Sequence, residues 1–534
     1  MPKILNVAVI GAGTMAQAVH LPVLRRRWDR FTVAALVDHS PRRRREASEV
    51  WGVAEERRYE TVADLVAAVR ARTLALDGVL LSTDGLHVDD LLSLVRRGIP
   101  VMVEPPLGYS AAEIAKVTEF ERIAGRRLVM MAYPQQYDDS VTRMAEHVAV
   151  KDLRMVDHEV LMPASQPLYG QAHVTTSSYD LPTEKRSERR KALQAAVEAG
   201  AGDGATQRDR DLYVKGLLTG VAHQMAVTEA AYGPITKLVA VRHWPKGVIP
   251  GSIELLGELE SGAQVRLVWH YLPFAPEYSE TVQVLSARRR MRLDLPAPSH
   301  GDSRSTVSLR EKKSGVVQEV ATTAPKGAAE LMWEAFHAFV EKGVAPISGA
   351  AEAERQIVLL REVLATIVGA DGRSLEKEPE EDGEEETSGE SADEAGSADG
   401  AVSAEVPAVE VEAPPRDPAA DEQAPVTEPV AAVAAEEGHA EPVEPAAPEP
   451  APVESAPEAP EAVEPAPVEP APETLEQSVA TDVPDALGAA EVVDAWSAEP
   501  APEAQPAAEQ PAAEELPAAE PRRDRAPDAE DPRP

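Results

Sequence analysis

The sequence contains no cysteine, which excludes disulfide bonds and metal sites built from thiolates. No apolar run approaches the ~20 residues of a membrane-spanning helix, and no basic stripe is interleaved with aromatic side chains as in nucleic-acid-binding proteins. The first residues also lack the charged and long apolar regions of a secretion signal. We therefore expect a cytoplasmic protein that binds neither membranes nor nucleic acid, and no pattern of ligands indicates a metal site.

Acidic charge is concentrated in the C-terminal part of the chain. The 534 residues carry a formal net charge of −38, yet 6 Lys and Arg residues stand against 45 Asp and Glu residues from Glu376 onward, a net of −39. This part is rich in Pro, Ala and Glu, so it cannot bury enough apolar surface to offset the entropy lost on ordering. We expect residues 371–534 to form a disordered tail. Within it, Leu475–Trp496 has apolar residues at roughly helical spacing. We interpret it as a slightly less polar part of the disordered tail, with a helix that folds on a protein partner as the alternative.

The N-terminal motif consists of an apolar run followed by a glycine turn. Residues Ile4–Ile10 have the length and β-branched content of a buried parallel strand. They are followed by Gly11-x-Gly13-x-x-Ala16 and then by a helical pattern. In this context Gly11 allows a tight turn, Gly13 lets the backbone approach a pyrophosphate, and Ala16 allows close packing of helix and strand. We predict that the turn binds a dinucleotide through Gly11, Ala12, Gly13, Thr14 and Met15.

Strand-like and helical segments alternate after this motif. Strands are expected at 31–37, 77–83, 100–103 and 127–132, with helices at 41–52, 61–70, 88–97 and 111–124 between them. The order predicts an α/β Rossmann domain, a doubly wound parallel sheet, over residues 1–132. Ligands of such sheets bind beyond the carboxyl ends of the strands. Asp38, Ser82, Thr83, His87, Glu104 and Tyr133 fall at those ends. All of these except Tyr133, together with Pro105, are predicted to border the cofactor.

The residues after the second strand bear on the choice of cofactor. A carboxylate at Asp38 can accept both hydrogen bonds from an adenosine ribose, which favours NAD. Ser40, Arg42 and Arg43 follow closely, and their hydroxyl and guanidinium groups could instead hold the 2′-phosphate of NADP. We expect NAD as the cofactor, with NADP as the open alternative.

Four pieces of the sequence together resemble the cofactor domain of the Gfo/Idh/MocA oxidoreductases. They are the glycine turn followed by His20-Leu-Pro22, then Asp38, the Ser82-Thr83…His87 loop, and Glu104-Pro105-Pro106-Leu107. The resemblance covers roughly residues 3–369, apart from a charged insertion at about 175–215 that we expect to be a mobile surface loop or helix, or alternatively a lid. It implies a second, α+β domain with a large, mainly antiparallel sheet over residues 133–370. That sheet often pairs subunits in this family, so a homo-oligomer is expected, with Trp244, Trp269 and Tyr271 as contact candidates.

The resemblance implies hydride transfer between nicotinamide and a small-molecule substrate, a sugar, polyol or related compound. In the family, a Glu-Lys-Pro lysine and an Asp-x-x-x-His pair handle the proton. Here Pro105 stands at the lysine position and Thr219 at the aspartate position, and neither ionises at neutral pH. His223 is retained. A histidine titrates near neutral pH, so we predict His223 as the catalytic group, with Tyr133 as a phenolic donor.

Other interpretations of these residues stay open. His223 could be a hydrogen-bonded core histidine, and His87 is assigned to the cofactor. Asp157, His158 and Glu159 lie on one predicted strand, where alternation places them on different faces. The chain is predicted to be an oxidoreductase with an atypical active site, acting on a sugar, polyol or related carbonyl or imine compound. The alternative is a dinucleotide-binding sensor or scaffold without turnover that carries an acidic interaction tail.

Overall fold

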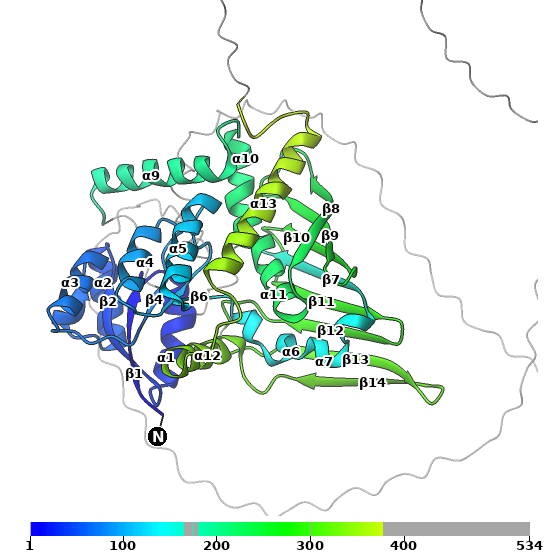
Figure 1. Cartoon of the computed structure of the whole chain (residues 1–534), viewed down its shortest axis with the longest axis horizontal. Helices are drawn as coiled ribbons and strands as arrows, with labels where there is room; N and C mark the ends of the chain where they lie inside the picture. The colour runs from blue at the N-terminus through cyan, green and yellow to red at the C-terminus, as the bar shows by residue number, and fades with distance from the viewer. Residues whose placement is uncertain (1, 165–173, 175–179, 301, 378–534) are drawn as a thin grey trace, which may run out of the picture. The chain divides into compact units, whose positions relative to one another are not determined.

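The computed structural model describes residues 2–164, 174, 180–300 and 302–377 (Figure 1). The predicted tail from residue 378, including the candidate segment Leu475–Trp496, lies outside the described residues. In the part of the chain that is described, no helix has both the length and the apolar character needed to cross a membrane.

The N-terminal half forms a six-stranded parallel sheet with strand order β3-β2-β1-β4-β5-β6. This is the strand order of a Rossmann domain, so the predicted fold class is confirmed. The strands are β1 Leu5–Ile10, β2 Phe31–Val37, β3 Arg58–Tyr59, β4 Gly78–Leu81, β5 Val101–Val103 and β6 Val129–Met131. The helices are α1 Leu21–Arg26, α2 Pro41–Trp51, α3 Val62–Arg70, α4 Val88–Val95 and α5 Ala111–Ala124.

Local signals in the sequence set the ends of these helices. Ser40, Thr61 and Ser110 precede α2, α3 and α5, and each side chain accepts a hydrogen bond from a backbone N–H of the first turn. Gly52 and Gly125 end α2 and α5 in the left-handed conformation. The helix after the glycine turn differs from the expected one, because it begins as a π-helical turn, Ala16–His20, before α1.

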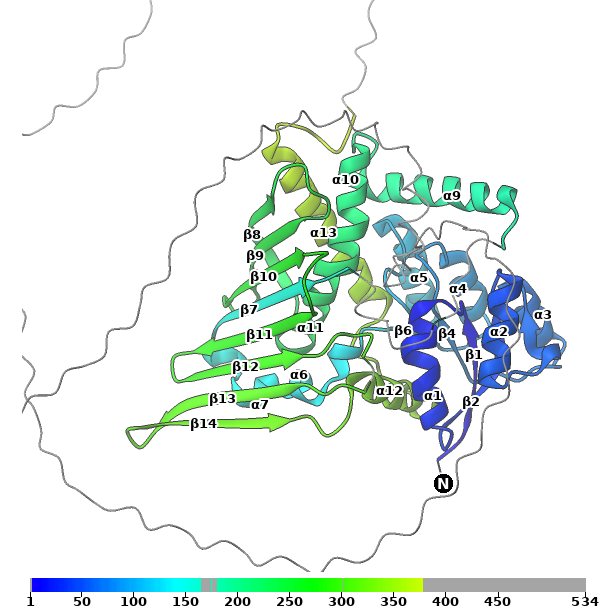
Figure 2. The same cartoon turned by 180° about the vertical axis from the view of Figure 1, so that it is seen from behind.

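The second half forms an eight-stranded sheet with strand order β14-β13-β12-β11-β7-β10-β9-β8. Neighbouring strands are antiparallel except β7 and β10, which are parallel, so the expected mainly antiparallel sheet is confirmed. The strands are β7 Leu153–Met162, β8 Ile235–Trp244, β9 Ser252–Leu259, β10 Gln264–Tyr271, β11 Ser279–Ser286, β12 Arg289–Leu295, β13 Thr306–Lys313 and β14 Val316–Thr323. Figure 2 shows this sheet from behind, with β8 and β14 at opposite edges.

Helices of the second half pack against this sheet and against the Rossmann domain. They are α6 Asp139–Thr142, α7 Met144–His147, α9 Thr183–Ala201, α10 Gln207–Leu212, α11 Ala222–Tyr232, α12 Ala328–Lys342 and α13 Ala350–Ala370, with a π-helical segment Tyr213–Val221 between α10 and α11. A Cβ atom on Gly220 would lie 2.4 Å from the Trp269 ring, and Trp269 is 2% exposed. Trp269 is therefore a core residue under this helix, and its expected place in an oligomer contact is wrong.

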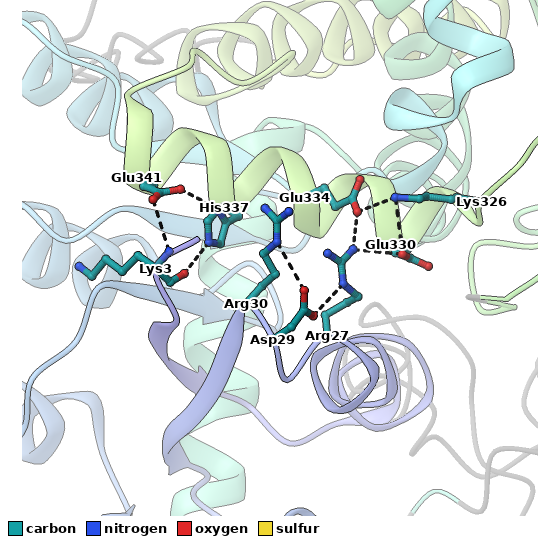
Figure 3. A network of polar contacts seen from close by, with 9 residues as sticks. All are labelled: Lys3, Arg27, Asp29, Arg30, Lys326, Glu330, Glu334, His337 and Glu341. Carbon is teal, nitrogen blue, oxygen red and sulfur yellow. Dashed lines mark hydrogen bonds and ion pairs between the residues drawn. The ribbon is translucent and has the colours of Figure 1, made fainter. Parts of the chain in front are cut away.

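Helix α12 packs against the Rossmann domain although it follows the second sheet in the chain. The Trp333 and Phe31 rings meet edge to face, with centroids 5.2 Å apart. A Cβ atom on Gly78 of β4 would lie 2.8 Å from the Phe336 ring, so the glycine makes room for this helix. Figure 3 shows the polar contacts at its surface, where Arg27 lies 3.1 Å from Glu330 and the backbone oxygen of Lys3 accepts from His337 Nε2 at 2.8 Å. The apolar cores of the two halves are continuous.

The packed chain continues past Ala370. Arg373 binds both carboxylate oxygens of Asp209, at 2.6 and 2.8 Å. Leu375 is buried, and its carbonyl accepts from the N–H of Gly204 at 2.8 Å. The segment that follows α13 is thus held by the insertion helices.

Candidate functional site

The glycine turn links β1 to the first helix. Gly11 has φ +84°, and a Cβ atom there would lie 2.2 Å from the Ser82 carbonyl oxygen, so this position requires glycine. At Gly13, by contrast, no atom in the described part of the chain lies within 4 Å of an added Cβ. The turn is therefore open where the motif places the pyrophosphate, and its residues fit a dinucleotide.

Asp38 joins the end of β2 to the glycine turn. Its carboxylate accepts from the Ala12 N–H at 2.8 Å, from the Ser40 N–H at 2.9 Å and from Arg43 Nε at 2.9 Å. A carboxylate offers about four acceptor positions. Three are used, so Asp38 has room to accept from one ribose hydroxyl. The sequence had suggested that it could accept from both.

The loop after β4 carries the Ser82, Thr83 and His87 side chains. His87 Nδ1 lies 2.8 Å from Thr83 Oγ1, and the ring is buried. Burial lowers the pKa of His87 to about 4, so the imidazole is neutral at neutral pH. It can orient a ligand by hydrogen bonding, and it does not contribute a positive charge.

Glu104 follows β5 and is held from two directions. His20 Nε2 binds the Glu104 carboxylate, and the Trp333 indole N–H donates to His20 Nδ1 at 3.1 Å. Because an indole nitrogen only donates, Nδ1 must accept and the His20 proton lies on Nε2. Trp333, a residue of α12, thereby fixes the tautomer of His20. The Nε2–H of this tautomer holds the carboxylate of Glu104, the residue before Pro105.

Neither Pro105 nor Thr219 has an ionisable side chain. Pro105 has no side-chain donor or acceptor. The Thr219 hydroxyl donates to the Val214 carbonyl at 2.8 Å, within its own π-helical segment. This bond engages the hydroxyl with the backbone of its own segment.

A carboxylate from a different strand contacts the retained histidine. His223 Nε2 lies 2.8 Å from Glu280 Oε1, and His158 Nε2 lies 2.9 Å from the same oxygen. The second oxygen of Glu280 accepts from the Tyr278 hydroxyl at 2.7 Å. Burial alone would raise the pKa of Glu280, but the attraction of His223 and the hydrogen bonds from both histidines hold that pKa well below its usual range. Glu280 is therefore a buried, ionised carboxylate.

Tyr133 lies beside this cluster. Its ring centroid is 6.5 Å from that of His223. Burial, with a further contribution from Glu104, raises the pKa of Tyr133 above its usual range, so the phenol stays protonated at neutral pH. Tyr133 also lines a small cavity together with Pro106, Leu218 and Ala222. The loop after β5, the end of β6 and the helix that carries His223 therefore meet at one place.

The sequence did not single out Glu280 or Tyr278, and it placed His158 on a strand without a role. The predicted alternation along that strand is confirmed, because His158 is buried while Glu159 is exposed. A signal for Glu280 existed in β11, where Glu280, Val282 and Val284 alternate inward and are all buried. A glutamate on the apolar face of a strand needs a buried partner.

Residues 5–133 match the family model described as an oxidoreductase family with an NAD-binding Rossmann fold, Gfo/Idh/MocA. The chain is 33% identical over 138 residues to an inositol 2-dehydrogenase of Renibacterium salmoninarum, covering 25% of this chain and 38% of the relative. It is 30% identical over 173 residues to an inositol 2-dehydrogenase of Pseudarthrobacter chlorophenolicus, covering 31% of this chain and 48% of the relative. The chain thus spans less than half the length of these curated relatives.

The fold extends further than the sequence similarity. The crystal structure of aldose-aldose oxidoreductase from Caulobacter crescentus, complexed with glycerol, matches with a TM-score of 0.52 at 17% identity, covering 70% of this chain and 99% of that one. At this identity the match shows the two-domain fold alone. Residues 5–133, with the open glycine turn, thus form a Rossmann domain of the kind described by the NAD-binding Gfo/Idh/MocA family model.

Proposed function

We propose that this protein is an NAD-dependent oxidoreductase acting on a sugar, polyol or related carbonyl or imine compound, with His223 as the proton-transfer residue. The observation that carries the proposal is the contact between His223 Nε2 and the buried, ionised Glu280. This pair lies beside Tyr133, at the carboxyl edge of a dinucleotide-binding sheet. The matched inositol 2-dehydrogenases support a polyol or sugar as the substrate.

The Rossmann domain supplies the cofactor site in this proposal. The glycine turn Gly11–Met15 holds the pyrophosphate, Asp38 accepts from a ribose hydroxyl, and the loop with Ser82, Thr83 and His87 borders the dinucleotide. The bound coenzyme would accept a hydride in its oxidised form and give one in its reduced form. Glu104 and Pro105 border the nicotinamide end, where Glu104 is held in place by His20.

His223 handles the proton that must leave or arrive with each hydride. Its Nε2–H points to Glu280, so Nδ1 is the atom that accepts the proton of a carbinol. The negative charge of Glu280 stabilises the imidazolium that results. His158 touches the same carboxylate but is fully buried, whereas the His223 side chain is 13% exposed. The protonated Tyr133 phenol serves as a hydrogen-bond donor to the substrate oxygen.

Glu280 therefore takes over the part that the family aspartate plays beside its histidine. Position 219 is threonine, yet His223 still has a carboxylate partner, from β11 instead of its own helix. The lysine position has no such substitute, because no ionisable side chain other than that of Glu104 stands at the Glu104–Leu107 segment.

The proposal is tested on the full chain by fluorescence titration with NADH, followed by turnover assays on a panel of sugars, polyols and imines. His223→Ala should lower turnover by about a hundredfold or more and leave the Kd for NADH unchanged. His243→Ala is the matched control, because His243 lies on β8 and its Nε2–H donates to the Pro250 carbonyl at 2.9 Å. Wild-type protein that binds no NADH would overturn the proposal.

Pro105 and Thr219 favour a second candidate function, a coenzyme-binding sensor or scaffold without turnover. In this case the wild-type protein binds NADH but converts no substrate of the panel. Pro105→Lys combined with Thr219→Asp separates the two candidates further. A gain of turnover in the double variant, from none in the wild type, would support the sensor. A cytoplasmic location and assembly of subunits through the second sheet remain predictions of the same proposal.

A further inference from the structure

The predicted insertion carries helix α9, which is anchored to the Rossmann domain. Lys185 Nζ lies 2.6 Å from Glu60 Oε1, and Arg189 pairs with the buried Asp84 carboxylate. Glu60 follows β3 and Asp84 follows β4, so the helix runs along the carboxyl edge of the parallel sheet (Figures 1 and 2). That edge is where a dinucleotide binds in this fold.

Just before α9, Asp180 contacts the first turn of α2. Its Oδ2 atom accepts from the Ser40 hydroxyl at 2.8 Å and from the Arg42 N–H at 2.9 Å. Ser40 precedes α2, whose 11 residues begin at Pro41. The backbone N–H groups and dipole at a helix N-terminus favour an anion, and here the bound anion is a carboxylate of this chain.

Three arginine side chains of α2 also make hydrogen bonds to acceptors of this chain. Arg43 Nε binds Asp38 at 2.9 Å, Arg42 Nε binds Glu46 at 3.0 Å, and the Arg44 guanidinium donates to the Asp38 carbonyl. Of these, Arg42 and Arg43 are the arginines that, with Ser40, could have received the 2′-phosphate of NADP. Asp38 and Asp180 instead place two carboxylates around the segment after β2.

We infer that Asp180, on the insertion, is a specificity-determining residue that makes the cofactor site reject NADP. The inference rests on the proposed binding of a dinucleotide by the Rossmann domain. The ribose 2′ position lies at the segment after the second strand in this fold. A 2′-phosphate there would compete with Asp180 for the Ser40 hydroxyl and the Arg42 N–H, and its charge would be repelled by the carboxylate. The 2′-hydroxyl of NAD is neutral and can donate to a carboxylate.

The test compares the affinities of the full chain for NADH and NADPH, measured by coenzyme fluorescence. Asp180→Asn removes the charge and keeps an oxygen that can accept from Ser40. It should strengthen NADPH binding by about tenfold or more and change NADH binding by less than about threefold, because one like-charge contact is removed. Glu184→Gln is the matched control, since it removes an exposed carboxylate four residues after Asp180 and should leave the ratio of the two affinities unchanged.

Each outcome decides a different claim. If wild type binds NADH and Asp180→Asn leaves the ratio unchanged, the inference is wrong and the proposed function stands. If Glu184→Gln shifts the ratio as far as Asp180→Asn, the effect comes from the net charge of the segment and the inference is also wrong. If wild type binds neither coenzyme, the proposed function fails and the inference fails with it. An unchanged Tm for Asp180→Asn establishes that the variant is folded.

Discussion

The side chains of His223 and His158 meet at one atom, Oε1 of Glu280, at 2.8 and 2.9 Å. Because an ionised carboxylate only accepts, both histidines must carry a proton on Nε2. The structure thereby fixes the tautomer of His223 through an interaction made by a strand, β11, that is distant in sequence. Because His223 is held by this carboxylate, we expect proton transfer by His223 to depend on the charge of Glu280.

Glu280→Gln should lower turnover by about a hundredfold, because the neutral amide no longer stabilises a protonated His223. The Kd for NADH should not change, since Glu280 lies on the second sheet and not at the glycine turn. The measurement is kcat as a function of pH together with coenzyme titration. Glu159→Gln, on the opposite and exposed face of β7, is the control. Equal turnover in Glu280→Gln and wild type would contradict the role given to Glu280.

Gly13→Val should weaken coenzyme binding by about tenfold or more, or abolish it, because the added side chain would occupy the open space where the motif places the pyrophosphate. The Tm should not change. Gly11→Ala should instead lower Tm, since its Cβ would collide with the Ser82 carbonyl and its φ is +84°. Thermal unfolding and NADH titration of both variants check the pair. A stable Gly13→Val protein with wild-type affinity would place the phosphates elsewhere.

Trp333→Phe keeps a ring against Phe31 and removes the donor to His20. The buried Nδ1 of His20 then lacks its partner, which costs about 1–3 kcal/mol, so Tm should fall by a few degrees. The His20 proton is also no longer confined to Nε2, so NADH binding should weaken as Glu104 loses its fixed partner. Trp28→Phe is the control, because Trp28 is 74% exposed. The same Tm for both variants would show that the indole N–H contributes nothing.

Asp209→Asn should destabilise the protein at neutral pH and progressively less on acidification. Burial alone would raise the pKa of Asp209, but hydrogen bonds from Arg373 and Thr206 lower it to about 2. An aspartate in an unfolded chain has a pKa of about 3.9. The stabilisation is therefore fully present above that pKa and is lost as the pH falls toward about 2.

The difference in Tm between wild type and Asp209→Asn, followed from pH 7 downward, measures this effect. Burial raises the pKa of the nearby Asp211 instead, so Asp211→Asn should not lower Tm at neutral pH. A difference that grows on acidification would contradict the sign of the Asp209 shift.

The sequence predicted the elements whose signals are local. The strand Phe31–Val37 and the helix Ala111–Ala124 have the predicted bounds, because a buried parallel strand and a capped helix are each written in consecutive residues. Asp38 and Glu104 were placed correctly at strand ends for the same reason. Strands β12 to β14 were missed. Most of β13 and all of β14 are exposed or half-buried, which hides the alternation on which a strand prediction rests, whereas β12 does alternate charged and buried apolar residues.

The contacts between distant segments could not be predicted in this way. Glu280 is one of 91 acidic residues in the sequence, and its pairing with His223 depends on how β11 is placed beside β7. Asp180 lies in a segment that the sequence suggested as surface decoration or a lid, and its partner Ser40 is 140 positions away. Such pairs follow from the tertiary fold rather than from any local pattern.

The position of helix α12 has a mechanical consequence. Trp333 and Phe336 are anchored in the Rossmann domain, although α12 follows the second sheet in the chain. Bending one half away from the other would have to break the His20–Trp333 bond and expose the face of β4 at Gly78. In the part of the chain that the structure describes, the end of the first sheet is therefore not a free hinge. We expect the two halves to move together when a ligand binds.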